Sequence, residues 1–385
     1  MIKGVAALNT PLIGKAGSRT QLETPAMLLD AKVFEQNVAV LADLSKKYGV
    51  ALRPHAKSHK CANIAKRQIE AGALGLCCAK PGELLALFEA GIKQLMLSAP
   101  VSSPRKIEHL AQAAAAGCEL IVVVDREDLI TAYGAAARKA GTKISVLVDC
   151  DVGLGRTGAT TPHHVVELAS AISKEEGLIY AGIQAYSGQV QHVFDMESRR
   201  QINLAANNRI MEMIMALRDA KLAPKIISGG GTGSHLIDFE DRIFTEVQAG
   251  SYVFMDEGYL PVDIHGTGAG EKVFGMSLFV VVTVIGHSAG NGQAITDGGT
   301  KSFAIDGPPP RAFLKGKEIG TILWAGDEFG RIKTHPGIPA PPAGTRIECT
   351  IPHCDPTANL HSVLHVVRGD TLEAIWPVEA RGYSD

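Results

Sequence analysis

Nine short apolar runs recur along the first two thirds of the chain, and amphipathic segments separate them. The runs are AMLLD (26–30), VALRPHAK (50–57), LGLCCAK (74–80), QLMLSAP (94–100), ELIVVVD (119–125), KISVLVDCD (143–151), LIYAGIQAY (178–186), KIISGGG (225–231) and EVQAGSY (246–252). Between them, segments such as 31–49 and 198–221 have apolar residues at helical spacing. Strands that are apolar on both faces and alternate with single helices indicate a parallel sheet covered by helices, and about eight such units usually close into a barrel. An open, doubly wound sheet is the alternative.

The pattern changes after about residue 260, where the helical spacing disappears. Strand-like runs follow, separated by Gly/Pro-rich loops such as DGPPP (306–310) and HPGIPAPPAG (335–344). This alternation is typical of an antiparallel β domain. The predicted fold class is therefore α/β, with a TIM-type (β/α)8 barrel over residues 1–260 and a C-terminal antiparallel β domain over residues 261–385.

Charge and composition limit the partners. A net charge of −2 without long runs of like charge argues against nucleic acid or a membrane surface, so the expected ligand is a small molecule. No stretch approaches a bilayer span, and the N-terminal segment lacks the apolar core of a signal peptide. The seven cysteines are scattered without CxxC spacing, which suggests a reducing compartment. We expect a cytoplasmic protein.

The segment RPHAKSHK (53–60) crowds five basic or imidazole side chains at the end of an apolar run. Active sites of β/α barrels lie at the carboxyl ends of the strands. If the strand continues, Arg53, His55 and Lys57 share one face. Neighbouring cations would disfavour the ammonium form of Lys57, and a neutral amine is what condensation with a carbonyl requires. A solvated lysine at a strand end is the alternative.

The segment SGGGTGS (228–234) has few side chains and many accessible amides after a strand. Such a loop can surround a phosphate with backbone N–H groups, although it lacks the spacing of a dinucleotide fingerprint or a P-loop. A tight turn without a ligand is the alternative. A phosphate loop and a buried lysine in one barrel point to pyridoxal 5′-phosphate, whose aldehyde needs the amine.

A third signal is PHCDPTANLH (352–361) near the end of the chain. His353 and Asp355 would lie on one face if this segment is a strand, with Cys354 on the other face. An imidazole and a carboxylate are suitable ligands for a divalent ion. Two ligands are a weak signal, and a hydrogen-bonded His/Asp pair in a turn is the alternative.

Taken together, these segments resemble a known family. RPHAKSHK, GLCCAKPGE, DVGLGRTG, QAYSGQVQH, ISGGGTGS, EVQAGSYVFMD and PHCDPTANLH are similar to the D-threonine aldolase group of fold-type III pyridoxal-phosphate enzymes, which are related to D-serine dehydratase and alanine racemase. The resemblance runs from about Thr24 to Arg381. It implies an alanine-racemase-like barrel with a β domain, and a homodimer with shared active sites. It also implies that AMLLD packs either outside the closed sheet or with the C-terminal domain, and that the first 25 or so residues can pack with the β domain.

The resemblance assigns cofactor roles. Lys57 would bind the cofactor covalently, Arg156 would face the pyridine nitrogen, and Tyr186 would lie beside the ring. The phosphate would be held mainly by backbone amides of Gly231, Thr232, Gly233, Ser251 and Tyr252. A guanidinium cannot accept a proton, so the pyridine nitrogen would stay unprotonated and withdraw electrons more weakly.

The resemblance also assigns a metal and a reaction. His353 and Asp355 would hold a divalent cation, and the carboxylate ligand favours Mn²⁺ or Mg²⁺ over zinc, which suits the cysteine ligand of the dehydratase relatives. The cation would stabilise the β-oxygen of the substrate as the Cα–Cβ bond breaks. His192 would be the base; the alternative is that it only orients a metal-bound water. We expect a lyase that cleaves D-β-hydroxy-α-amino acids, such as D-threonine or D-phenylserine, to glycine and an aldehyde.

Other functions remain open. A D-3-hydroxyaspartate aldolase, a dehydratase of D-serine or D-threo-3-hydroxyaspartate, and a non-catalytic pyridoxal-phosphate carrier are the alternatives. Ser187, Ala79 and Phe329 depart from the usual histidine, glutamine and histidine of the relatives. All three are expected near the substrate, where they would alter the side-chain preference at Cβ.

Overall fold

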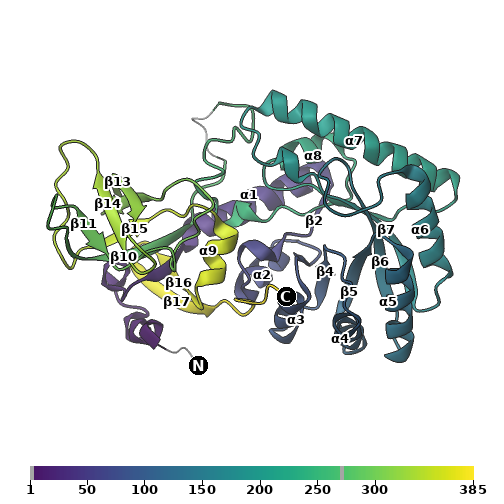
Figure 1. The fold of residues 1–385 in the computed structure, drawn as a ribbon, viewed down its shortest axis with the longest axis horizontal. Coiled ribbons are helices and arrows are strands. Elements are labelled where there is room, and N and C mark those ends of the chain that lie inside the picture. Colours follow the sequence, from purple (N-terminus) through teal and green to yellow (C-terminus); the bar gives the residue numbers. More distant parts are fainter. Residues whose placement is uncertain (1–3, 269–272) are drawn as a thin grey trace.

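The computed structural model describes residues 4–268 and 273–385, and within these ranges the strands form an eight-stranded parallel sheet and a nine-stranded, mainly antiparallel sheet. Figure 1 shows the parallel sheet with its helices at one end of the molecule and the antiparallel sheet at the other. The α/β fold class is confirmed: an alanine-racemase-like barrel is joined to a C-terminal β domain.

The parallel sheet closes into a barrel. Its strands lie in the order β2-β9-β8-β7-β6-β5-β4-β3. A bridge between His55 and Cys77 joins the two edge strands, and the Cys77 N–H donates to the carbonyl of Pro54 at 2.8 Å. The open doubly wound alternative is therefore wrong. The strands are β2 (Ala51–Leu52), β3 (Leu76–Cys78), β4 (Gln94–Leu97), β5 (Glu119–Val124), β6 (Ile144–Cys150), β7 (Leu178–Ala185), β8 (Ile226–Gly229) and β9 (Glu246–Val247).

Helices cover the outside of the barrel (Figure 1). They are α1 (Ala31–Tyr48), α2 (Ala62–Glu70), α3 (Pro81–Glu89), α4 (Pro104–Ala115), α5 (Glu127–Lys139), α6 (Pro162–Lys174), α7 (Met196–Asp219) and α8 (His235–Asp241). Local sequence sets their ends: in α1, the Asp30 side chain accepts the Val33 N–H, and Gly49 ends the helix with a φ of 69°. No helix among the described residues is long and apolar enough to cross a membrane.

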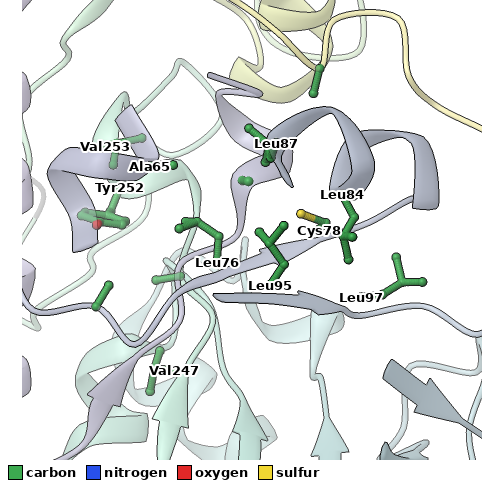
Figure 2. Packing of buried hydrophobic residues seen from close by; sticks show 14 of the residues in the cluster. Ala65, Leu76, Cys78, Leu84, Leu87, Leu95, Leu97, Val247, Tyr252 and Val253 are labelled. Carbon is green, nitrogen blue, oxygen red and sulfur yellow. The ribbon is translucent and has the colours of Figure 1, made fainter. Parts of the chain in front are cut away.

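Alternate residues of the barrel strands face opposite sides, and both sides are apolar. Figure 2 shows Leu76 and Leu95 of neighbouring strands on the side of the sheet where Leu84 and Leu87 of α3 lie. The alternate residues of the barrel strands point inward and form a separate core: Cys77, Met96, Ile121, Val123, Leu147 and Ala181. Burial of both faces explains why these strands are continuous apolar runs.

The second sheet has the order β11-β14-β13-β12-β15-β10-β1-β16-β17. The run AMLLD forms β1 (Ala26–Asp30), which lies in this sheet, antiparallel to β10 and parallel to β16. The other strands are β10 (Leu278–His287), β11 (Ala294–Thr296), β12 (Arg311–Leu314), β13 (Lys317–Trp324), β14 (Gly330–Thr334), β15 (Arg346–Cys349), β16 (Val363–Arg368) and β17 (Thr371–Pro377). Short 3₁₀ helices complete the chain: η1 (Gly4–Leu12), η2 (Ser18–Gln21), η3 (Ala56–Ser58), η4 (Gly188–Val190) and η5 (Ser251–Val253).

The expected strand through PHCDP is wrong. β15 ends at Cys349, and residues Cys354–Leu360 form α9, whose N-cap is His353. The proline at position 356 falls in the first turn of α9, where a missing N–H costs no hydrogen bond. The helix packs against η3 between the two sheets, so it brings residues near the end of the chain to the mouth of the barrel (Figure 1).

Candidate active site

A cavity of about 310 Å³ opens where the barrel strands end. It is lined by six of the predicted site residues: Lys57, Arg156, Tyr186, Gly231, Thr232 and Ser251. Its charged lining among the described residues consists of Lys57, Lys80 and Arg156, with no aspartate or glutamate. Such a lining favours an anionic ligand.

Lys57 lies in the turn η3 rather than on a strand, so the predicted alternation of Arg53, His55 and Lys57 is wrong. The strand ends because His55 caps the turn: its Nδ1 accepts the Lys57 N–H at 3.3 Å. Since Nδ1 is an acceptor, Nε2 carries the proton and donates to Ser98 Oγ at 3.0 Å. Burial, with the charge of Lys57, holds the pKa of His55 well below its usual value, so this imidazole is neutral.

His59 provides a matched control for His55, because its Nδ1 accepts the Cys61 N–H at 3.1 Å but it does not line the cavity. We expect His55→Phe and His59→Phe each to lower the free energy of unfolding by about 1–2 kcal/mol through loss of a cap. Only His55→Phe should also weaken binding of pyridoxal 5′-phosphate, because only His55 orients the turn that carries Lys57. Urea denaturation and absorbance titration measure the two effects. Equal affinities in both variants would contradict this role for His55.

Lys57 forms an ion pair with Asp355 of α9 at 3.2 Å. The Asp355 carboxylate raises the pKa of Lys57 and outweighs the burial that would lower it. Burial opposes ionisation of Asp355, but the charges of Lys57 and His353 outweigh it and lower the pKa of Asp355. The expectation that neighbouring cations disfavour the Lys57 ammonium is therefore wrong, because it overlooked a carboxylate about 300 residues away in sequence.

Arg156 lies on the loop after β6, with its guanidinium 5.6 Å from the centre of the Tyr186 ring. The Asp151 carboxylate shapes this loop by accepting the N–H groups of Gly153 and Leu154, both at 2.9 Å. No ion pair is present for Arg156 in the described part of the chain, so its charge is available to a ligand in the cavity.

The glycine-rich loop after β8 faces the same cavity, and some of its amides already have partners. The Gly231 N–H donates to Ser234 Oγ at 3.2 Å, and the Gly233 N–H donates to Gln191 Oε1 at 2.9 Å. The Tyr252 N–H donates to Thr232 Oγ1 at 3.2 Å. A Cβ at position 233 would lie 2.0 Å from the Gln191 carbonyl oxygen, so only glycine allows this approach.

His192 is exposed and is not part of the cavity lining itself. Its ring packs on Tyr259, which lines the cavity, at a centroid distance of 4.4 Å. The fully buried guanidinium of Arg199 donates to the carbonyl oxygens of Val193 and Asp263, which lie in the segments that carry His192 and Tyr259. Arg199 thus holds these two segments together.

The candidate metal ligands flank the start of α9. His353 Nδ1 lies 2.8 Å from Asp306 Oδ2, and the carboxylate of Asp355 faces Lys57. Cys354 is buried, with its backbone N–H donating to Asp256 Oδ2 at 2.9 Å. Within residues 4–268 and 273–385, no group of three or more His, Cys, Asp or Glu side chains is arranged to hold a metal ion. An imidazole and a carboxylate could supply two ligands to a divalent cation, with substrate and water as the others.

Sequence reasoning missed several residues that line the cavity: Lys80, Ser98, Gln184, Gln191, Gln248 and Tyr259. Lys80 and Ser98 belong to the predicted runs LGLCCAK and QLMLSAP, so a search for every polar residue at a strand end would have found them. Of the three departures from the relatives, Ala79 lines the cavity. Ser187 is buried beside it, whereas Phe329 is 44% exposed on the β domain.

A (β/α)8 barrel with a lysine after its first strand, joined to a β domain that includes the strand before the barrel, defines the alanine-racemase class of fold. The model of the alanine racemase N-terminal domain matches residues 29–258, and that of a putative serine dehydratase domain matches residues 277–367.

The chain is also similar to individual proteins of known activity over nearly its whole length. The chain is 38% identical to D-threonine aldolase of Arthrobacter sp. over 384 residues, covering 100% of this chain and 99% of the relative. It is 34% identical to 3-hydroxy-D-aspartate aldolase of Paracoccus denitrificans, covering 94% and 93%. The crystal structure of D-threonine aldolase from Filomicrobium marinum is 37% identical, with a TM-score of 0.89, and covers 94% of this chain and 97% of that one. The chain therefore belongs to the fold-type III pyridoxal-phosphate enzymes, in the D-threonine aldolase family, as its motifs predicted.

The cavity suits the cofactor of this family. An amine, two further cations and the hydroxyls of Thr232 and Ser251 face one space that lacks a carboxylate lining among the described residues. A phosphorylated aldehyde needs an amine for the aldehyde, and N–H and O–H donors for the phosphate.

Proposed function

We propose that this chain cleaves D-β-hydroxy-α-amino acids of the D-threonine or D-phenylserine type to glycine and an aldehyde. The observation that supports this most directly is the 3.2 Å contact between the Lys57 amine and the Asp355 carboxylate. Through it, the group that would bind the cofactor and a group that would bind a cation meet at one point. When bound, pyridoxal 5′-phosphate supplies a sink for electrons left on Cα, and a divalent cation, Mn²⁺ or Mg²⁺, stabilises negative charge on the β-oxygen.

The chain's own residues would bind and orient these groups. Lys57 would hold the cofactor, and Tyr186 would lie against its ring. Arg156 would face the pyridine nitrogen and, as a guanidinium that cannot accept a proton, would leave that nitrogen unprotonated. The phosphate is held by the glycine-rich loop and η5: Gly231, Thr232, Gly233, Ser251 and Tyr252. His353 and Asp355 hold the cation. Burial of the cavity floor excludes water and strengthens each of these charge interactions.

His192 is proposed to remove the proton from the substrate β-hydroxyl. We expect His192→Gln to lower kcat by about 10²- to 10⁴-fold, because a general base contributes roughly that factor. Cofactor absorbance should be unchanged. If His192 only orients a water on the cation, the variant should instead weaken cation binding by about 10- to 100-fold. Steady-state kinetics and a Mn²⁺ titration of the same variant separate the two roles.

Product analysis tests the reaction. Purified protein is incubated with D- and L-isomers of threonine, phenylserine and 3-hydroxyaspartate, with and without chelator. Glycine plus an aldehyde from D-isomers only, lost on chelation and restored by Mn²⁺, is the expected result. A 2-oxo acid plus ammonia would indicate a dehydratase, and cofactor uptake without turnover would indicate a carrier.

The 3-hydroxy-D-aspartate aldolase alternative has a specific observation in its favour. Lys80 lines the cavity and forms no ion pair in the described residues, so its ammonium could bind a second substrate carboxylate. A higher kcat/KM for 3-hydroxy-D-aspartate than for D-threonine, lost in Lys80→Met, would favour this substrate.

The proposal includes the assembly and location of the enzyme. We propose a homodimer with shared active sites, a barrel domain that ends at residue 260, and a β domain over 261–385 that β1 and the residues before it join. The family matches at 29–258 and 277–367 support a boundary between them. The described cysteines are buried free thiols, which supports the cytoplasm. Sedimentation analysis tests the dimer.

A further inference from the structure

A buried carboxylate lies beneath the cavity, and the proposed mechanism does not use it. Asp149 is in β6, with 5% of its surface exposed. Its Oδ1 accepts a hydrogen bond from Gln184 Nε2 at 2.8 Å, and its Oδ2 accepts one from Thr157 Oγ1 at 2.8 Å. An ionised carboxylate can only accept, so both partners must donate.

This requirement fixes the orientation of the hydrogen-bonded side chains in the floor of the cavity. Gln184 Nε2 also donates to the Ser98 carbonyl at 3.0 Å, so the amide nitrogen of Gln184 faces two acceptors and cannot exchange places with its oxygen. The Gln184 oxygen therefore faces Gln248, whose Nε2 donates to it at 3.2 Å and to Ser228 Oγ at 2.9 Å. Both glutamines line the cavity.

Asp149 also holds the loop that carries Arg156. Thr157, its second partner, is the next residue after Arg156. The Ala159 N–H donates to the Asp149 carbonyl at 2.8 Å, and the Asp151 N–H donates to the Ala159 carbonyl at 3.1 Å. The two ends of the loop are thus joined beside Asp149, and the Thr157 bond fixes the segment between them.

We propose that Asp149 is a positioning residue: its carboxylate orients Gln184 and the Arg156 loop so that the cavity accepts the ring of pyridoxal 5′-phosphate. This inference rests on the proposed cofactor site.

The charge on Asp149 responds to pH. Burial raises its pKa to about 6, while the bonds from Gln184 and Thr157 and the charge of Arg156 act to lower it and Asp125 acts to raise it. Above that value both oxygens accept. Below it, one oxygen carries a proton and acts as a donor, so the partner that faces this O–H must turn to accept or lose its bond. The arrangement that favours the cofactor is therefore lost as pH falls.

The test compares Asp149→Asn with wild type. Asparagine keeps the shape but has one acceptor instead of two. We measure the dissociation constant of pyridoxal 5′-phosphate from each apoprotein by absorbance, across mildly acidic to mildly alkaline pH. Titration of the cofactor phosphate affects both proteins alike, so the ratio of the two constants is the readout. In alkaline solution we expect wild type to bind pyridoxal 5′-phosphate about 10-fold more tightly than Asp149→Asn does. The ratio of the two dissociation constants should approach one below pH 6.

Asp151→Asn is the matched control, because Asp151 shapes the same loop without touching Gln184. Burial acts to raise the pKa of Asp151, but three backbone amides outweigh it and lower that pKa. The ratio of the cofactor dissociation constants of Asp151→Asn and wild type should therefore not change with pH in this range. Thermal unfolding confirms that each variant is folded. A ratio of one at every pH for Asp149→Asn, or the same pH dependence in Asp151→Asn, overturns the inference alone. Failure of wild type to bind the cofactor overturns the proposed function as well.

Discussion

Lys57→Ala should leave a colourless protein whose kcat/KM for D-β-hydroxy-amino acids is lower than that of wild type by about 10³-fold or more, since the proposed covalent anchor of the cofactor is lost. Lys80 is the other lysine among the described residues that lines the cavity. We do not expect it to replace Lys57, because it follows β3 rather than the turn that His55 caps. Absorbance of the bound cofactor and glycine release measure the two losses.

Lys80→Met is the matched control for this prediction. Lys80 is exposed and forms no ion pair among the described residues, so its loss should leave the fold and the cofactor absorbance intact. If Lys57→Ala remained yellow and turned over substrate as fast as wild type, the assignment of Lys57 would be refuted, and with it the proposed reaction.

Asp355→Ala should give the opposite pattern, with the cofactor retained and cleavage lost. We expect kcat to fall by about 10³-fold, because removal of the proposed ligand to a catalytic cation would forfeit several kcal/mol of charge stabilisation. The variant should also lower the pKa of Lys57, since the Asp355 charge is what raises it against burial. A lower pKa increases the neutral amine near pH 7, so cofactor binding should be at least as fast as in wild type.

Asp306→Ala provides a graded control. Asp306 contacts His353 rather than the Lys57 amine, so its loss should weaken cation binding by about 10- to 100-fold without removing a ligand. Added Mn²⁺ should restore Asp306→Ala and not Asp355→Ala. Full activity of Asp355→Ala in the presence of chelator would show that the cation site lies elsewhere.

The barrel could be predicted because its pattern is local. Each strand is apolar on both faces and each helix on one, so the alternation of the runs is readable from spacing. The position of the glycine-rich loop is equally local, because residues 231 and 233 directly follow the run that forms β8; that this loop binds a phosphate stays a prediction. The polar residues that form the floor of the cavity were missed. Ser98 lies in a run that had been identified, but a polar residue at a strand end does not reveal its hydrogen-bond partner.

The remaining differences come from contacts between distant segments. His55 caps the turn η3 and contacts Ser98, which follows β4, and α9 forms where a strand through PHCDP had been considered. The Lys57–Asp355 pair reverses the direction expected for the lysine pKa, since the sign of a pKa shift depends on the nearest charge.

The sequence by itself determined the alternation of strands and helices in the barrel and the family, and it predicts residues that could bind a phosphorylated aldehyde, because these depend on residue type and short-range spacing. Only the tertiary structure decided the ionic state of Lys57, the hydrogen-bond partners of the imidazoles beside it, and the orientation of the side chains in the floor of the cavity. Those properties follow from Coulomb and hydrogen-bond interactions that act over a few ångströms in space, whatever the separation along the chain.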